Sequence, residues 1–144
     1  MQSTFIVKLE KILTQLKNSK LEYLKASDKY DLPEYKRFFN MQSTQRNRFS
    51  QDITKLLRSM NVEVENLVIN QLNFDQIVIS SIGKTKHNHL SKCVEYDRKL
   101  ISLYEEALEI QPENDTLKDQ RDKISKVVQE NVQFLESAGF VLES

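Results

Sequence analysis

The chain has 144 residues and a mass of 17.0 kDa, which suits one domain, residues 1–144, with room for a hydrophobic core. Its 21 basic and 21 acidic residues balance at a pI near 6.7, so it lacks the positive excess expected of a nucleic-acid-binding protein. No apolar run approaches the roughly 20 residues of a membrane span, no signal peptide is recognisable, and a single cysteine fits a reducing compartment, so we expect a cytoplasmic protein.

Helices dominate the predicted secondary structure. Only two glycines and two prolines occur, which is too few for a turn-rich β protein. A helical stripe of apolar residues predicts a first long helix over about residues 3–30. Asp31 and Glu34 have the spacing of a capping box, and Pro33 is tolerated in a first helical turn. A second long helix is therefore predicted from this point to about residue 60.

The connection after the second helix is long. Its apolar pattern is weak, but residues 73–76 resemble a capping box and Gly83 suits the position just after a helix, which predicts a short helix over about 73–82. A third long helix is predicted from about residue 87 to 109, and Pro112 closes the next turn. The fourth helix is expected to end near Gly139, with Phe140 folding back on Leu135.

The length of this connection decides the predicted topology. Four helices are joined either by short loops or with one long crossover, as in the ferritin-like fold. Structureless loops beyond about 15 residues are uncommon in single domains. We therefore predict an all-α, ferritin-like four-helix bundle with one long crossover that carries the short helix. This topology places Leu90 near Tyr35 or Phe38, whereas an up-down-up-down connection places it beside Met60.

Each long helix carries a polar residue near the middle of its apolar stripe. These residues, Tyr23, Gln42, Asp97 and Asn131, fall at a common depth of about 12–15 Å if the crossover is present. Unpaired polar groups are costly in a core. We predict a core polar layer in which the Tyr23 hydroxyl donates to Asp97, and the amides of Gln42, Gln45 and Asn131 meet the remaining acceptors. The alternative is that each residue finds its own backbone or water partner.

The same positions are where a ferritin-like protein would bind metal. A ferritin-like di-iron centre takes Glu from two helices and a Glu-x-x-His pair from each of the other two. This chain offers Gln42 and Gln45 at that spacing, and neutral amides do not balance buried metal charge. We therefore predict no cofactor and a degraded site. The alternative is a single iron or manganese ion, with Asp28, Glu95 and Asp97 as candidate metal ligands.

The histidines and the cysteine are interpreted as structural. His87 and His89 lie at or just before the start of the third helix and are interpreted as surface or capping residues, because a zinc site would need a third ligand. Cys93 lies one helical turn before Asp97. It is interpreted as a buried structural thiol, since a nucleophilic thiol would need a nearby imidazole base.

Two stretches carry a family resemblance. Residues 21–28 (LEYLKASD), and residues 93–97 (CVEYD) leading to 104–108 (YEEAL), are similar to the signatures of a bacterial ferritin-like family, the domain of unknown function twenty-three eighty-three. Members carry acidic residues at the positions of Asp28 and Asp97, and a glycine where this chain has Glu22. The resemblance implies a ferritin-like fold and a bacterial source, but no established activity.

Two classes of function follow from these observations. The first is a non-enzymatic structural or interaction module, and the alternative is a ferritin-like metal-binding or oxidative-stress protein that uses core carboxylates. Self-association is expected because seven Phe and five Tyr exceed what a slim core readily hides, and Phe38 and Phe39 cannot both face inward. We predict a homodimer involving the start of the second helix. The sequence identifies no other protein partner.

Overall fold

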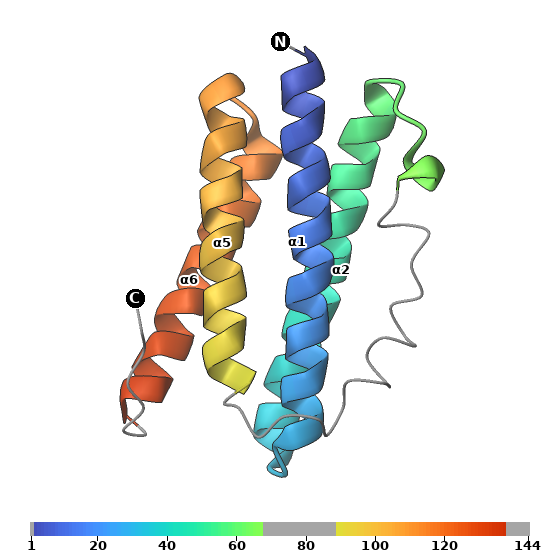
Figure 1. Cartoon of the computed structure of the whole chain (residues 1–144). Helices are drawn as coiled ribbons and strands as arrows, with labels where there is room; N and C mark the ends of the chain where they lie inside the picture. Colours follow the sequence, from blue (N-terminus) through green and yellow to red (C-terminus); the bar gives the residue numbers. More distant parts are fainter. Residues whose placement is uncertain (1, 68–88, 138–144) are drawn as a thin grey trace.

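The protein is described from a computed structural model, which defines residues 2–67 and 89–137 (Figure 1). Within these two ranges the chain forms four long α-helices and one 3-10 helix, with no strand. They are α1 (Gln2–Lys29), α2 (Pro33–Ser59), the 3-10 helix η1 (Val64–Asn66), α5 (His89–Ile110) and α6 (Asp115–Ser137). The predicted all-α four-helix bundle is confirmed at this level. The short helix predicted over 73–82, and the predictions for His87, Gly139 and Phe140, lie outside the described residues.

The directions of the four long helices can be compared with the two predicted topologies. α1 and α2 are antiparallel, as are α5 and α6, and α5 begins at the end of the bundle where α1 turns into α2 (Figure 1). α2 and α5 therefore run in the same direction. Leu90, at the start of α5, lines one cavity together with Tyr35 and Phe38. This is the neighbourhood that the crossover topology requires.

In α1 and in α2, one series of buried residues follows steps of three and four, the repeat of helices that pack side by side. In α1 this series includes Ser19 between Leu16 and Tyr23, and all three are fully buried. In α2 the series is Phe39, Ser43, Arg46, Ser50, Ile53 and Leu57, and Phe49 beside it is also buried. The predicted α2 stripe through Gln42 was therefore wrong in its middle, where Gln42 and Gln45 are only half-buried.

The start of α2 also differs from its prediction. Leu32, not Asp31, is the residue before the helix, and no side chain caps it. Pro33 occupies the first turn as expected, and the backbone N–H groups of Tyr35 and Lys36 both donate to the Leu32 carbonyl at 3.1 Å. Proline suits this position because its missing N–H would have no partner there. The capping box is thus absent, and the proline and backbone turn define this end.

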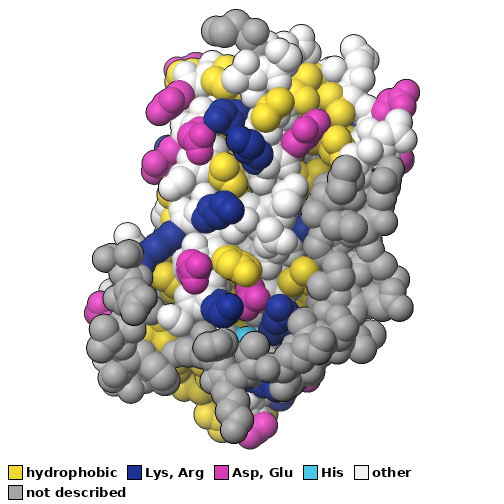
Figure 2. Space-filling model, viewed as in Figure 1, with side chains coloured by type: hydrophobic (Ala, Val, Ile, Leu, Met, Phe, Trp, Pro, Cys, Tyr) yellow, Lys and Arg dark blue, Asp and Glu magenta, His cyan; other side chains and the backbone are white. Residues whose placement is uncertain are grey.

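Surface chemistry is mixed on the side of the molecule that Figure 2 shows. Basic and acidic side chains alternate over this face without a large area of one sign. No described helix is long and apolar enough to cross a membrane.

Phe39 is buried and Phe38 is half-buried, with their ring centroids 5.5 Å apart. As expected, the two rings do not both face the core.

Candidate functional site

Asp97 of α5 is the centre of a hydrogen-bonded cluster inside the bundle. Its side chain is completely buried. Oδ1 accepts from the Ser19 hydroxyl at 2.7 Å, and Oδ2 accepts from the Tyr23 hydroxyl at 2.7 Å and from Arg46 Nη2 at 2.8 Å. The bond predicted between Tyr23 and Asp97 is present. Three helices, α1, α2 and α5, therefore meet at one carboxylate.

Arg46 of α2 supplies the positive charge of this cluster. Its guanidinium is fully buried, lies 5.0 Å from the centre of the Tyr23 ring, and donates from Nε to the Ser19 hydroxyl at 3.2 Å. Nη1 donates to the side-chain carbonyls of Gln42 at 3.0 Å and Gln45 at 2.8 Å. Both glutamines therefore accept hydrogen bonds from Arg46 at the edge of the cluster. The prediction that their amide N–H groups would donate to the cluster was wrong.

Asn131 brings α6 into the same cluster. Its Nδ2 donates to the Tyr23 hydroxyl at 3.0 Å. That hydroxyl has one proton, which it gives to Asp97, so it accepts from Asn131 and fixes the orientation of the amide. All four long helices thus meet at one level, as the core polar layer predicted. We refer to Ser19, Tyr23, Arg46, Asp97 and Asn131 as the Asp97 cluster.

Two members of the cluster, Tyr23 and Arg46, keep their protons near neutral pH. Burial raises the pKa of Tyr23 well above its ordinary value, and the negative charge of Asp97 raises it further. Burial alone lowers the pKa of Arg46, but the adjacent Asp97 carboxylate and the Tyr23 hydroxyl raise it by more, so it lies above its ordinary value. The cluster is therefore a buried ion pair with its hydrogen bonds satisfied. Neither Tyr23 nor Arg46 is suited to exchanging a proton at pH 7.

A second buried contact lies nearer the other end of the bundle, and sequence reasoning did not find it. The Tyr104 hydroxyl donates to Gln120 Oε1 at 2.5 Å, and Gln120 Nε2 donates to the Phe49 carbonyl at 3.3 Å. Burial raises the pKa of Tyr104 well above its ordinary value. This contact ties α5, α6 and α2 together. Gln120 is 1 % exposed and follows Leu117 by three residues, a helical spacing that identifies it as a core position.

The three candidate metal ligands do not come together. Asp28 and Glu95 are exposed, whereas Asp97 is buried in its cluster. In the part of the chain that the structure describes, no group of three or more His, Cys, Asp or Glu side chains is arranged to hold a metal ion. Asp97 is also the only carboxylate in the Asp97 cluster, as far as the described residues show. The arrangement thus offers a metal one buried carboxylate, which already accepts three hydrogen bonds.

His89 is buried, so its interpretation as a surface or capping residue was wrong. It is 7 % exposed, and its Nδ1 lies 4.0 Å from Glu22 Oε2, beyond hydrogen-bonding distance. Both ring nitrogens and that carboxylate oxygen lack a hydrogen bond to any of the residues that the structure describes. Burial lowers the pKa of His89. Cys93 is fully buried, as expected, and burial raises the pKa of its thiol well above the ordinary value, which disfavours the reactive thiolate.

No model of a known family, no curated protein and no solved structure matches this chain. The resemblance of residues 21–28 and 93–108 to a ferritin-like family therefore stays a prediction. The function has to be argued from the site itself.

Proposed function

We propose that this chain is a non-enzymatic, ferritin-like helical bundle that acts as a structural or interaction module and whose metal site is degraded. The ferritin-like part rests on the helix directions, because a parallel α2 and α5 is the arrangement that one long crossover produces (Figure 1). The observation that carries the rest is the fully buried Arg46 on Asp97.

Arg46 is the reason that a metal is not expected. Ferritin-like metal sites collect carboxylates from four helices, so that their negative charge offsets the bound cations. Here one helix contributes Asp97, α2 contributes a guanidinium, and α6 contributes the neutral Asn131. A metal ion on Asp97 would lie beside the positive charge of Arg46, which in practice is never deprotonated. Arg46 therefore occupies the place beside Asp97 where a metal cation would otherwise balance the carboxylate.

The reactive groups of the described core support a non-enzymatic protein. General acid–base catalysis works best with a pKa near the working pH. Burial moves the pKa values of Tyr23, Cys93 and Tyr104 well above their ordinary values, so all three stay protonated near neutral pH. These side chains are suited to holding helices together.

Metal analysis tests this proposal. Protein purified without chelator and without a nickel affinity tag is expected to contain far less than one iron or manganese per chain. The measurement is elemental analysis by mass spectrometry, with Asp97→Asn protein prepared in parallel as the control. Stoichiometric iron or manganese in the wild type that is lost in Asp97→Asn would contradict the degraded site.

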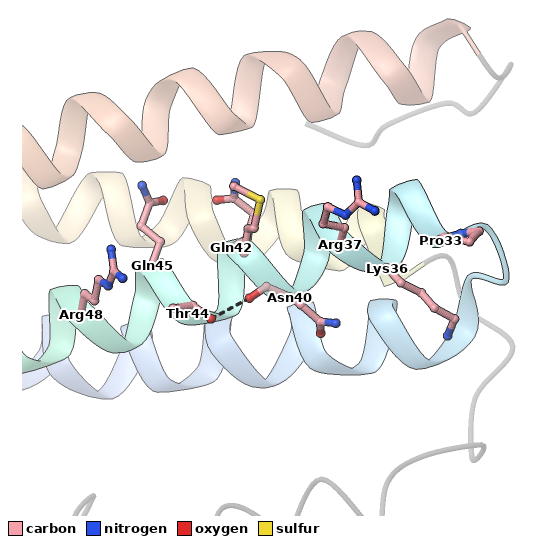
Figure 3. Close-up of a pocket in the computed structure, with 9 residues that line it drawn as sticks. Pro33, Lys36, Arg37, Asn40, Gln42, Thr44, Gln45 and Arg48 are labelled. Carbon is pink, nitrogen blue, oxygen red and sulfur yellow. Dashed lines mark hydrogen bonds between the residues drawn. The ribbon is translucent and has the colours of Figure 1, made fainter.

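The interaction part of the proposal concerns the outer face of α2. A groove of about 720 Å³ runs along this helix, and its described lining comes entirely from α2 (Figure 3). Met41 lies in it with 62 % of its surface exposed. The charged lining residues, Lys36, Arg37 and Arg48, are all basic. An exposed apolar side chain framed by one sign of charge is typical of an interaction surface.

A second copy of the chain suits this α2 groove. Basic side chains outnumber acidic ones in α1 and α2, whereas acidic side chains outnumber basic ones in α5 and α6. The basic α2 groove of one copy can therefore face the acidic helices α5 and α6 of another copy, although the whole chain has no net charge. We propose a homodimer in which the first half of α2 lies in the interface.

Met41→Asp is expected to convert this dimer to monomer, because it replaces the exposed apolar contact with a charge. Light scattering over a concentration series measures the change. Val7→Asp is the matched control, since Val7 is also exposed, at 46 %, but lies on α1 away from the groove. A wild-type protein that is monomeric at millimolar concentration, or a dimer that both variants leave intact, would contradict the proposed interface.

A further inference from the structure

A second cavity, of about 320 Å³, lies between the starts of α2 and α5 and the last turns of α6. Its walls are mainly apolar, and its described lining residues are Glu34, Tyr35, Phe38, Phe39, Leu90, Glu130, Asn131 and Phe134. A volume of this size is in the range of small-molecule sites. It is separate from the outer α2 groove, with which it shares no described lining residue.

Aromatic rings form much of the cavity wall. Tyr35 of α2 meets Phe134 of α6 edge to face, with ring centroids 5.3 Å apart. Phe38 packs against Phe39 in the same way at 5.5 Å. Tilted rings expose both faces and edges, and the negative face of an aromatic ring attracts cations. The walls thus suit a ligand with an apolar body and a positive charge.

The charges around the cavity have the complementary sign. Glu34 on α2 and Glu130 on α6 are exposed lining residues, and neither forms an ion pair or hydrogen bond among the described residues. No Lys or Arg is part of the described lining. Two unpaired carboxylates from different helices, at the edge of an apolar cavity, attract a cation and repel an anion.

Asn131 places a hydrogen-bond acceptor in the same cavity. Its side chain is 3 % exposed and its Nδ2 is committed to the Tyr23 hydroxyl. Because Tyr23 gives its only proton to Asp97, the amide cannot turn round without losing a bond. Among the described residues no group donates to Asn131 Oδ1, and Asn131 lines the cavity, so this oxygen can accept a hydrogen bond from a ligand. The Asp97 cluster thus orients this group.

We propose that this cavity binds a small arylalkylammonium or alkylammonium ion. The apolar body packs among Tyr35, Phe38 and Phe134, the ammonium group donates to Asn131 Oδ1, and Glu34 and Glu130 stabilise its charge. The site does not depend on self-association or on a metal, so it stands independently of the proposed function.

Three probes of similar shape test the charge preference. We expect 2-phenylethylammonium to bind wild-type protein about five- to tenfold more tightly than neutral 2-phenylethanol, and 3-phenylpropionate to bind most weakly. NMR titration measures the affinities. The largest shifts are expected for the Tyr35, Phe38 and Phe134 rings.

Surface variants then locate the charge effect without disturbing the core. Glu34→Gln combined with Glu130→Gln should remove most of the preference for the cation over the alcohol. Glu109→Gln combined with Glu113→Gln, at the other end of the bundle, is the matched control and should keep it. Equal binding of all three probes, tightest binding of the neutral alcohol, shifts centred elsewhere, or a preference that survives the first double variant would each overturn the proposal.

Discussion

Replacing Arg46 with alanine is expected to lower the free energy of unfolding by about 3–5 kcal/mol, because it leaves a buried carboxylate without its counter-charge. Asp97 would keep its bonds from Ser19 and Tyr23 but lose the one from Arg46. The Ser19 hydroxyl would also lose a donor. Urea denaturation followed by circular dichroism measures the loss.

Two further variants separate the ion pair from a general effect of losing a long side chain. Arg48→Ala lies two residues away on the exposed side of α2 and should unfold like the wild type. Arg46→Met combined with Asp97→Leu removes both charges and should cost much less than the sum of the single changes. Should Arg46→Ala prove as stable as Arg48→Ala, the buried ion pair would not be a stabilising feature of the core.

The fold was largely predictable because apolar spacing and helix-breaking residues are local signals. Pro33 lies at the start of α2, and Pro112 lies in the turn between α5 and α6, as predicted. The length of the connection after α2 predicted the direction of α5 (Figure 1). The capping box at Asp31 failed, because the backbone carbonyl of Leu32 satisfies the first turn. A sequence pattern indicates that a helix begins nearby, but the competition between side-chain and backbone acceptors decides the residue.

The common depth of the cluster along the bundle was predicted, but the buried positive charge of Arg46 was not. Counting steps of three and four from Phe39 reaches Ser43, Arg46 and Ser50, and then Ile53 and Leu57. Since three of those positions are polar, the predicted apolar stripe passes through Gln42 and leaves Arg46 out. A strict seven-residue count would have placed Arg46 inside. That one residue supplies donors to Asp97, Gln42 and Gln45 and reverses the expected role of the glutamines.

The burial of His89 could not be read from its own neighbourhood in the sequence. Its partner in space is Glu22 on α1, 4.0 Å away and far apart along the chain. Local periodicity assigns a residue to one face of its helix, but it does not identify which side chain the other helices bring opposite it. Unsatisfied groups such as these reduce stability, and here they lie outside the Asp97 cluster.

Replacing Phe39 with alanine is the second change expected to have a large effect, about 3–5 kcal/mol of unfolding free energy. Phe39 is 2 % exposed, and its ring lies 5.0 Å from that of Tyr30 and 6.3 Å from that of Tyr23. Removing it leaves a cavity beside the Asp97 cluster. The adjacent Phe38 is half-buried, so Phe38→Ala should cost about 1 kcal/mol.

The contrast between these neighbours tests the seven-residue repeat of α2. The repeat that buries Arg46 also buries Phe39, because the two are seven residues apart, whereas the predicted stripe through Gln42 included both Phe38 and Phe39. Thermal and urea unfolding of the two alanine variants, measured under identical conditions, gives the order of their costs. A larger loss for Phe38→Ala than for Phe39→Ala would mean that α2 is rotated about its axis, with Arg46 turned out of the core.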